Sequence, residues 1–332
     1  TNSLALNSGT IRDAAGNNAT LTLATPGATN SLGANKALVI DTAVPTITGV
    51  SLASDNSTLA VTMSEAVYNT SGGSGALEAS DFAFSISGGL ATLGSSTPSS
   101  ISASGNVYTL GIPLTGYSPN GSETLTVVPT DNGIYDLPGN EAATSQNNNT
   151  ATLNDKLAPY LTASSLAADN SYIDATYSEG FYSTNGGSGA IDKSDINFIF
   201  AQNNGSATAA VISSLKQQNN TSESSASALQ AGATTVRAFL TITGTPSGVE
   251  TVSWSTVNDA SIFDAVGNAT PSAWTATPLK LNDKLAPTMT ITATDGSSAV
   301  SDGATTNDGT LTVTFTSSEA TSNFAAADIT VS

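Results

Sequence analysis

Carboxylate and carboxamide side chains carry most of the chemistry available to this 332-residue chain. The chain has no His and no Cys, which removes imidazole bases, thiol nucleophiles and the common zinc and copper ligands. Oxygen ligands remain, and calcium requires roughly six to eight of them from carboxylates, Asn side chains and backbone carbonyls. The composition therefore directs attention to a calcium site.

Candidate calcium ligands occur twice in the same order along the chain. Each set combines the Glu of a Ser-Glu pair, the Asp of an Asp-x-x-Gly-Asn stretch and an Asn-Asp pair at a junction between repeats. We expect two calcium sites at domain ends, the first built from Glu65, Asp136, Asn154 and Asp155 and the second from Glu179, Asp264, Asn282 and Asp283. The sequence leaves open which end of a domain faces the junction.

A structural interpretation of the same residues stays open beside the metal site. The stretch from Asp136 to Asn140 is also typical of a tight turn, in which the Asp accepts hydrogen bonds from its own backbone and Gly139 takes a positive φ. Glu65 is equally compatible with a solvated strand end.

The domain organisation follows from a repeated junction. Residues 153–159 and 281–287 both read Leu-Asn-Asp-Lys-Leu-Ala-Pro, and a looser copy begins at Ile40. The junction aspartates lie 114 positions apart (155 − 41) and then 128 apart (283 − 155), a period of whole-domain size. We predict the closing part of a domain at 1–40, complete repeats at 41–154 and 155–282, and the opening part of a shorter repeat at 283–332. The second repeat carries an insertion at 201–235.

Alternation of apolar and polar residues predicts the elements that position the candidate ligands. Leu59, Val61 and Met63 share one face, and Phe82 and Phe84 share another. Turn-forming Gly, Pro, Asn and Ser clusters separate such runs, and no window shows helical periodicity. The fold class predicted is all-β, with about seven strands in a sandwich for each repeat.

Charge and composition bound the partners and the location. Eight Lys+Arg against 26 Asp+Glu give a net charge of −18, which disfavours nucleic acid and anionic membrane surfaces. No apolar run approaches the ~18 residues of a membrane span. Low Lys content with abundant Thr, Ser, Asn and Gly indicates an extracellular or bacterial cell-surface protein, and the pattern at both termini indicates a segment of a longer chain.

Catalysis is not expected. Asp131 and Asp136 could in principle do acid and base work on a sugar, but they lie in Gly- and Asn-rich turn sequence without an aromatic cluster. The sequence therefore predicts a protein that is not an enzyme.

The shared order of these motifs resembles the bacterial immunoglobulin-like tandem repeats of large surface adhesins and surface-layer proteins. The likeness rests on the junction Asp followed by Pro, the Ser-Glu pair, an Asp-Phe or Asp-Ile strand, and the late Asp-x-x-Gly-Asn. It implies a linear string of immunoglobulin-like β-sandwich domains, export and calcium at the domain ends. Residues 154–159 also resemble the calcium-binding linker of cadherins, with Lys156 where that linker has Asn.

Three functional expectations follow. The first is a calcium-stiffened stalk in a bacterial adhesin or surface filament, with neighbouring immunoglobulin-like domains of the same or an identical chain as partners. The second is a binding module that contacts a glycan or protein through the insertion at 201–235. The third is a filament subunit that assembles by strand donation between 283–332 of one copy and 1–40 of the next.

Overall fold

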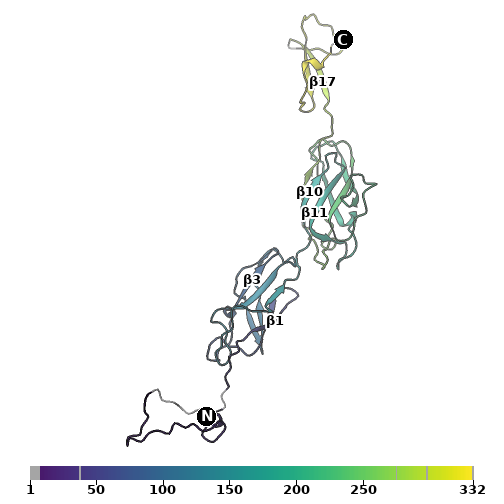
Figure 1. Ribbon diagram of the computed structural model, residues 1–332. Helices are drawn as coiled ribbons and strands as arrows, with labels where there is room; N and C mark the ends of the chain where they lie inside the picture. The colour runs from purple at the N-terminus through teal and green to yellow at the C-terminus, as the bar shows by residue number, and fades with distance from the viewer. Residues whose placement is uncertain (1–7, 37–38, 274, 297, 331–332) are drawn as a thin grey trace. The chain divides into compact units, whose positions relative to one another are not determined.

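The computed structural model describes residues 8–36, 39–273, 275–296 and 298–330 (Figure 1). Its sheets are antiparallel, which confirms the all-β class predicted from the sequence. The chain divides into two compact units, 1–154 and 155–332. Within the described ranges, no helix has both the length and the apolar character that a membrane crossing requires.

The first domain consists of two main sheets and a short ribbon. One sheet has the order β1-β2-β6-β5 and the other β3-β8-β9, while β4 pairs with β7. A 3-10 turn, η1 (Ala79–Asp81), leads into β3. The strands are β1 (Ile47–Leu52), β2 (Thr58–Met63), β3 (Phe82–Ser87), β4 (Ala91–Leu93), β5 (Ile101–Ser104), β6 (Val107–Gly111), β7 (Leu114–Gly116), β8 (Thr124–Pro129) and β9 (Thr150–Thr152).

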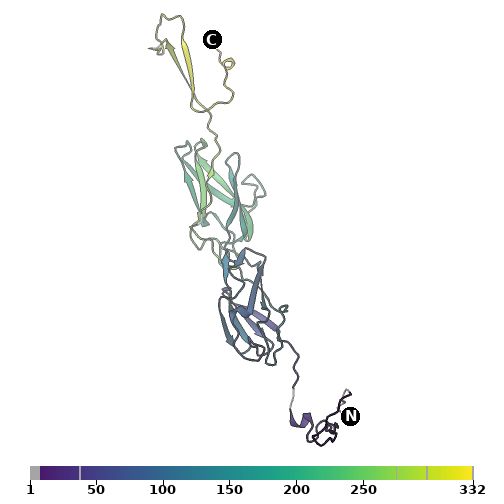
Figure 2. The same cartoon turned by 90° about the vertical axis from the view of Figure 1, so that its left-hand side faces the viewer.

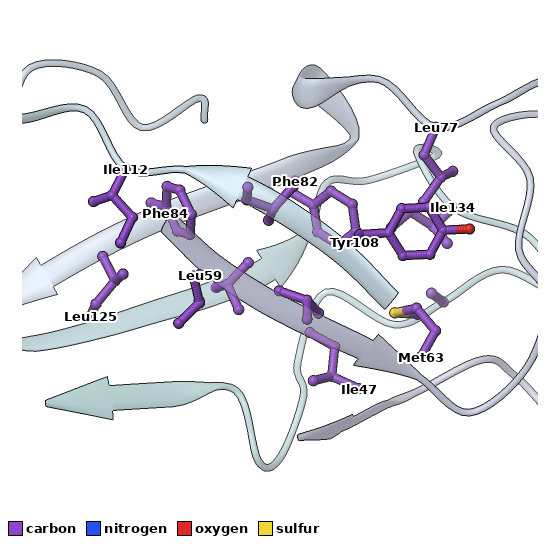
Figure 3. Packing of buried hydrophobic residues seen from close by; sticks show 14 of the residues in the cluster. Ile47, Leu59, Met63, Leu77, Phe82, Phe84, Tyr108, Ile112, Leu125 and Ile134 are labelled. Atoms are coloured by element: carbon purple, nitrogen blue, oxygen red, sulfur yellow. The ribbon is translucent and has the colours of Figure 1, made fainter. Parts of the chain in front are cut away.

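The core of the first domain lies between the two sheets. In β2 every second residue is buried, and Leu59 and Val61 are fully enclosed, as their alternation predicted. Phe82 of β3 packs against Tyr108 of β6 with ring centroids 6.0 Å apart (Figure 3). Because each large apolar side chain contributes roughly 2 kcal/mol on burial, this interface holds the sandwich together.

The second domain repeats the arrangement with the sheets β10-β11-β14-β13 and β12-β15-β16. The two domains even share an irregularity, because β1 slips against β2 between Ile47 and Gly49, and β10 slips against β11 between Leu161 and Ala163. A 3-10 turn, η2 (Lys193–Asp195), precedes β12. The strands are β10 (Leu161–Leu166), β11 (Tyr172–Phe181), β12 (Ile196–Ala201), β13 (Ala209–Lys216), β14 (Ala233–Thr243), β15 (Thr251–Thr256) and β16 (Leu279–Lys280).

The predicted insertion at 201–235 is not a single loop. Its first half contains β13, which pairs along β14 and turns Ala210 and Ile212 into the core. The two strands are joined by the connection 217–232, which is held to the end of β13 by a bridge between Lys216 and Ala228. The corresponding strands of the first domain, β5 and β6, are joined by residues 105–106 alone. The polar composition of the stretch concealed a strand that has only one buried face.

The remaining segments carry fewer elements. The described residues 8–36 and 39–40 form α1 (Leu32–Asn35) and a bridge between Arg12 and Asn18. The described residues 283–296 and 298–330 form β17 (Met289–Asp295), β18 (Ser298–Ala299), β19 (Thr312–Ser317) and η3 (Ala326–Asp328). β17 and β19 lie side by side (Figure 2), with several apolar side chains exposed: Met289, Ile291, Leu311, Val313 and Phe324. Their assignment to further domains of the repeat stays a prediction, as does strand donation between them.

Two buried asparagines fasten the last residue of each complete domain. The Asn56 carboxamide, in the turn between β1 and β2, accepts the backbone N–H of Asn154 at 2.9 Å and donates to its carbonyl at 2.8 Å. Asn170 makes the same pair of bonds with Asn282, both at 2.8 Å. Asn56 and Asn170 have positive φ, a conformation that Asn tolerates better than most residues. The junction therefore begins at a fixed point on each domain.

Each domain also encloses one glutamate. Glu123, just before β8, is fully buried and accepts backbone N–H groups of Leu90, Ala91 and Asn120. Glu250, just before β15, does the same for three N–H groups, of Ala207, Ser247 and Val249. Burial alone would raise the pKa of each carboxyl, but the backbone donors outweigh it and hold the pKa below its ordinary value.

Because of these buried glutamates, we expect the free energy of unfolding of each domain to depend on pH in the acid range. Replacing Glu250 with Gln is expected to lower the free energy of unfolding of the second domain by about 2 kcal/mol at pH 7, because an ionised acceptor is lost. Since its folded pKa is lowered, the carboxylate stabilises the domain above the ordinary glutamate pKa and ceases to do so as the pH falls through the folded value. Denaturant unfolding in a pH series, followed by tryptophan fluorescence, measures this.

The chain supplies its own control, because both tryptophans belong to residues 155–282. Glu123→Gln should leave the fluorescence transition unchanged and shift only the unfolding of the first domain, seen by circular dichroism. If Glu250→Gln shows the same acid dependence as the unaltered chain, the buried carboxylate has no stabilising role.

Candidate metal centre

Three carboxylates converge within each complete domain. Asp41, Glu65 and Asp136 offer oxygen atoms that all lie within 4.8 Å of one another. The second domain brings its counterparts together in the same way: Asp155, Glu179 and Asp264. Each group combines a junction residue, the glutamate of a Ser-Glu pair and a residue of a late turn; Glu65 lies just beyond the end of β2, whereas Glu179 lies near the end of β11.

The late turn buries one carboxylate of each group. Asp136 is completely enclosed, and its Oδ1 accepts the backbone N–H groups of Gly139 at 2.8 Å and Asn140 at 2.6 Å. Its Oδ2 accepts from Asn140 Nδ2 at 2.7 Å, and Gly139 has a φ of 99°. Asp264 has equivalent bonds in its own turn. The tight turn expected from the sequence thus forms, and it holds the carboxylate against the other two.

In the first domain the Ser-Glu pair directly follows β2 and is positioned by its backbone bonds to the junction. Ser64 binds the incoming junction from both sides, since its N–H donates to the carbonyl of Thr46 and its Oγ accepts from the Thr46 N–H. A reciprocal backbone pair between Tyr68 and Tyr135, at 2.7 and 2.8 Å, then brings the chain after Glu65 beside the residue before Asp136. Tyr182 and Phe263 make the equivalent pair in the second domain.

The junction aspartate completes the group from the N-terminal side. Asp41 Oδ1 accepts the Ala43 N–H at 3.0 Å, and Asp155 Oδ1 accepts the Leu157 N–H at the same distance. In the first domain Asn140 Nδ2 also donates to the Asp41 carbonyl at 3.2 Å, which ties the junction to the buried turn. A local turn therefore holds each junction carboxylate in position within its acidic group.

Like charges are concentrated in these groups. Burial, and after it the charges of Asp155 and Asp264, raise the pKa of Glu179 to about 7. Burial followed by Asp136 and Asp41 raises the pKa of Glu65 as well. A divalent cation would relieve this repulsion and reverse the effect on the glutamates.

The structure changes the expected membership of both groups. Asn154 does not join Glu65 and Asp136, because it is bound to Asn56 before β2, whereas Glu65 follows the other end of that strand. Asp155 belongs to the group of Glu179, and Asn282 is bound to Asn170 as Asn154 is to Asn56.

Asp283 resembles the other junction aspartates but has no group of its own among the described residues. Its Oδ1 accepts the Leu285 N–H at 2.9 Å, and the next Ser-Glu pair follows at Glu319. Four of the eight candidate ligands lie in the group expected for them: Glu65, Asp136, Glu179 and Asp264. Asp155 lies in the group of the second domain instead of the first.

Asp41 is the residue that sequence reasoning missed, although a signal for it exists. Asp41 precedes Glu65 by 24 positions (65 − 41), and Asp155 precedes Glu179 by 24 positions (179 − 155). The constant spacing links each junction aspartate to the domain that follows it. The spacing from Glu65 forward to Asp155 does not recur between Glu179 and Asp283.

Comparison of the chain with protein-family models, curated proteins and solved structures found no match. The chemistry of the two groups therefore rests on their own donor set. Three carboxylates supply as many as six oxygens, and backbone carbonyls and water can complete the roughly six to eight that calcium takes. Zinc in proteins is bound chiefly by Cys and His, which the chain lacks. The residues present fit calcium.

Charge removal should have opposite effects with and without calcium. In chelator, Glu179→Gln is expected to stabilise the second domain by on the order of 1 kcal/mol at pH 8, because repulsion in a partly exposed acidic group is relieved. In calcium the same variant should be less stable than the unaltered chain, because a ligand is missing. Unfolding followed by tryptophan fluorescence, with Glu65→Gln as control, measures both; a change of the same sign in both conditions would argue against a metal centre.

Stoichiometry distinguishes the observed grouping from the one expected from the sequence. We expect calorimetric titration of the whole chain to give one strong calcium site for each acidic group, two in total. Asp41→Asn should remove one of them, because a charged ligand is lost. Asn154→Ala should keep both while lowering the stability of the first domain. Loss of a site in Asn154→Ala but not in Asp41→Asn would instead support the grouping expected from the sequence, in which Asn154 is a ligand of the first site.

Proposed function

We propose that this chain is part of a string of immunoglobulin-like domains that serves as an extracellular stalk of a bacterial adhesin or surface filament. Calcium at the domain ends stiffens the string. The observation that carries the proposal is that consecutive residues have two different attachments: Asn154 is fastened to the domain before it, and Asp155 belongs to the acidic group of the domain after it.

The fold supports the immunoglobulin-like assignment. Each complete repeat of somewhat over 100 residues places a four-stranded and a three-stranded antiparallel sheet around one core, as two-sheet sandwiches of this class do. Both repeats have the same order of strands in their two main sheets, the same buried glutamate and the same acidic group. Both also have the asparagine clamp, in which Asn56 binds the backbone of Asn154 and Asn170 binds that of Asn282. This regularity favours a mechanical array in which each domain does the same work.

The stiffening follows from the electrostatics of the junction. Without a cation, the junction aspartate is repelled by the glutamate and the buried aspartate of its own domain, so the peptide after the clamp gains freedom. Calcium would bind all three carboxylates and thereby fix Asp155, which directly follows the fastened residue Asn154. A junction held on both sides transmits force, whereas a loose one bends.

The composition supports an extracellular setting and a spacer role. Low Lys content and the absence of Cys leave few tryptic sites and no thiol to oxidise, which suits a long-lived protein outside the cell. The high negative charge keeps such a surface soluble.

Thermal unfolding and small-angle scattering test the proposal together. A ligand at about a hundred times its dissociation constant adds about 2.7 kcal/mol to the native state, which for domains of this size raises Tm by about 10 °C. Scattering in calcium should also show a longer and narrower distribution of maximum dimensions than in EDTA. The double variant Asp41→Asn, Asp155→Asn should lose both responses.

The two readouts separate the parts of the proposal. A higher Tm with unchanged scattering would mean that calcium stabilises the domains without stiffening the string. No response in either readout would remove calcium from the account altogether.

A further inference from the structure

The connection 217–232 of the second domain forms an open polar depression where it meets β14. The depression has a volume of about 510 Å³ and is lined by the two ends of the connection, residues 217–219 and 230–235. The first domain has only the two-residue turn 105–106 at this place. The depression is therefore a feature of the second domain that the repeated architecture does not require.

An arginine anchors the connection on the sheet. Arg237 of β14 is 7% exposed and donates two hydrogen bonds to the Asp174 carboxylate, at 2.7 and 2.6 Å. Its Nη1 donates to the Asn220 carbonyl at 2.7 Å, and its guanidinium lies 3.7 Å from the centre of the Tyr172 ring. Such a bidentate and stacked arginine has few alternative positions, so it fixes the start of the connection.

Further hydrogen bonds fix the positions of two lining residues, Gln218 and Asn219. Gln218 Nε2 donates to two sheet carbonyls, those of Ala175 and Val236, both at 3.0 Å. Asn219 holds the opposite side of the connection through Ser227, accepting its N–H at 3.1 Å and donating to its Oγ at 2.7 Å. The walls are thus organised before any ligand arrives, which lowers the entropy cost of binding.

The lining offers neutral hydrogen-bonding groups and no charge. Its side chains are carboxamides, hydroxyls and methyl groups. The hydroxyls of Thr234 and Thr235 have no hydrogen-bond partner among the described residues, and Gln218 presents its remaining carbonyl oxygen while Nε2 is engaged. At the edge, the Tyr182 hydroxyl lies close enough to Gly232 that a Cβ there would be 2.7 Å from it.

We propose that this depression binds a neutral oligosaccharide. Hydroxyl and carboxamide groups can both donate and accept, which matches the alternating donors and acceptors of sugar hydroxyls. A shallow, polar and prearranged surface suits a chain of sugars better than a compact apolar ligand, whose site is concave and mostly apolar. The net charge of −18 disfavours acidic glycans. The second domain then combines attachment with its place in the stalk.

Nuclear magnetic resonance of the whole isotope-labelled chain tests this proposal. Neutral oligosaccharides of glucose, galactose and N-acetylglucosamine are titrated in EDTA, so that failure of the calcium proposal cannot affect the result. Binding of at least one of them should shift the amide signals of residues 217–219 and 230–235, and leave the first domain unchanged.

Two substitutions test whether the lining itself makes the contacts. Thr234→Val and Gln230→Ala should each weaken binding about fivefold, the effect of one hydrogen bond. Thr241→Val, an exposed threonine on the same strand away from the depression, should bind as the unaltered chain does. The proposal is overturned if none of the neutral sugars shifts these signals, if only an acidic oligosaccharide binds, or if Thr234→Val and Thr241→Val behave alike.

Discussion

Three carboxylates lie close together in each complete domain, although their charges repel one another. Ordinary hydrogen bonds hold the three carboxylates together against this repulsion. They form a buried turn around Asp136, a serine contact that fastens the junction beside Glu65, and a turn at Asp41. Each of these arrangements satisfies its own backbone groups, so the domain folds although like charges remain together. A divalent cation bound by these carboxylates would offset the repulsion between their charges.

Under the proposed stalk function, the position of the acidic group would give a bound metal a mechanical effect. A metal within the core of a domain would affect stability alone, whereas a metal that holds the junction residue also restricts how the chain leaves the preceding clamp. The same scaffold tolerates additions on its sheet edge, as the connection 217–232 illustrates, because Arg237 ties that connection down without disturbing either the core or the acidic group. Under the two proposals, stiffening by calcium and sugar binding use separate parts of the second domain.

The sequence allowed the all-β class to be predicted because alternation at Leu59 and Val61 reports a buried strand face directly. It also selected Glu65 and Asp136, whose motifs recur. It misplaced Asn154, since which end of a sandwich meets a junction depends on pairings between residues almost a hundred positions apart. β13 escaped detection because the stretch around it, 201–235, is rich in Ser, Asn and Gln, and pairing with β14 defines it as a strand.

Crystallography of the chain grown with calcium, with diffraction data collected at a wavelength where calcium scatters anomalously, measures whether calcium occupies the two acidic groups. We expect one anomalous peak in each complete domain, bound by Asp41, Glu65 and Asp136 in the first and by Asp155, Glu179 and Asp264 in the second. Ordered domains with no peak at these carboxylates, or with a peak at Asn154 in place of Asp41, would contradict this expectation.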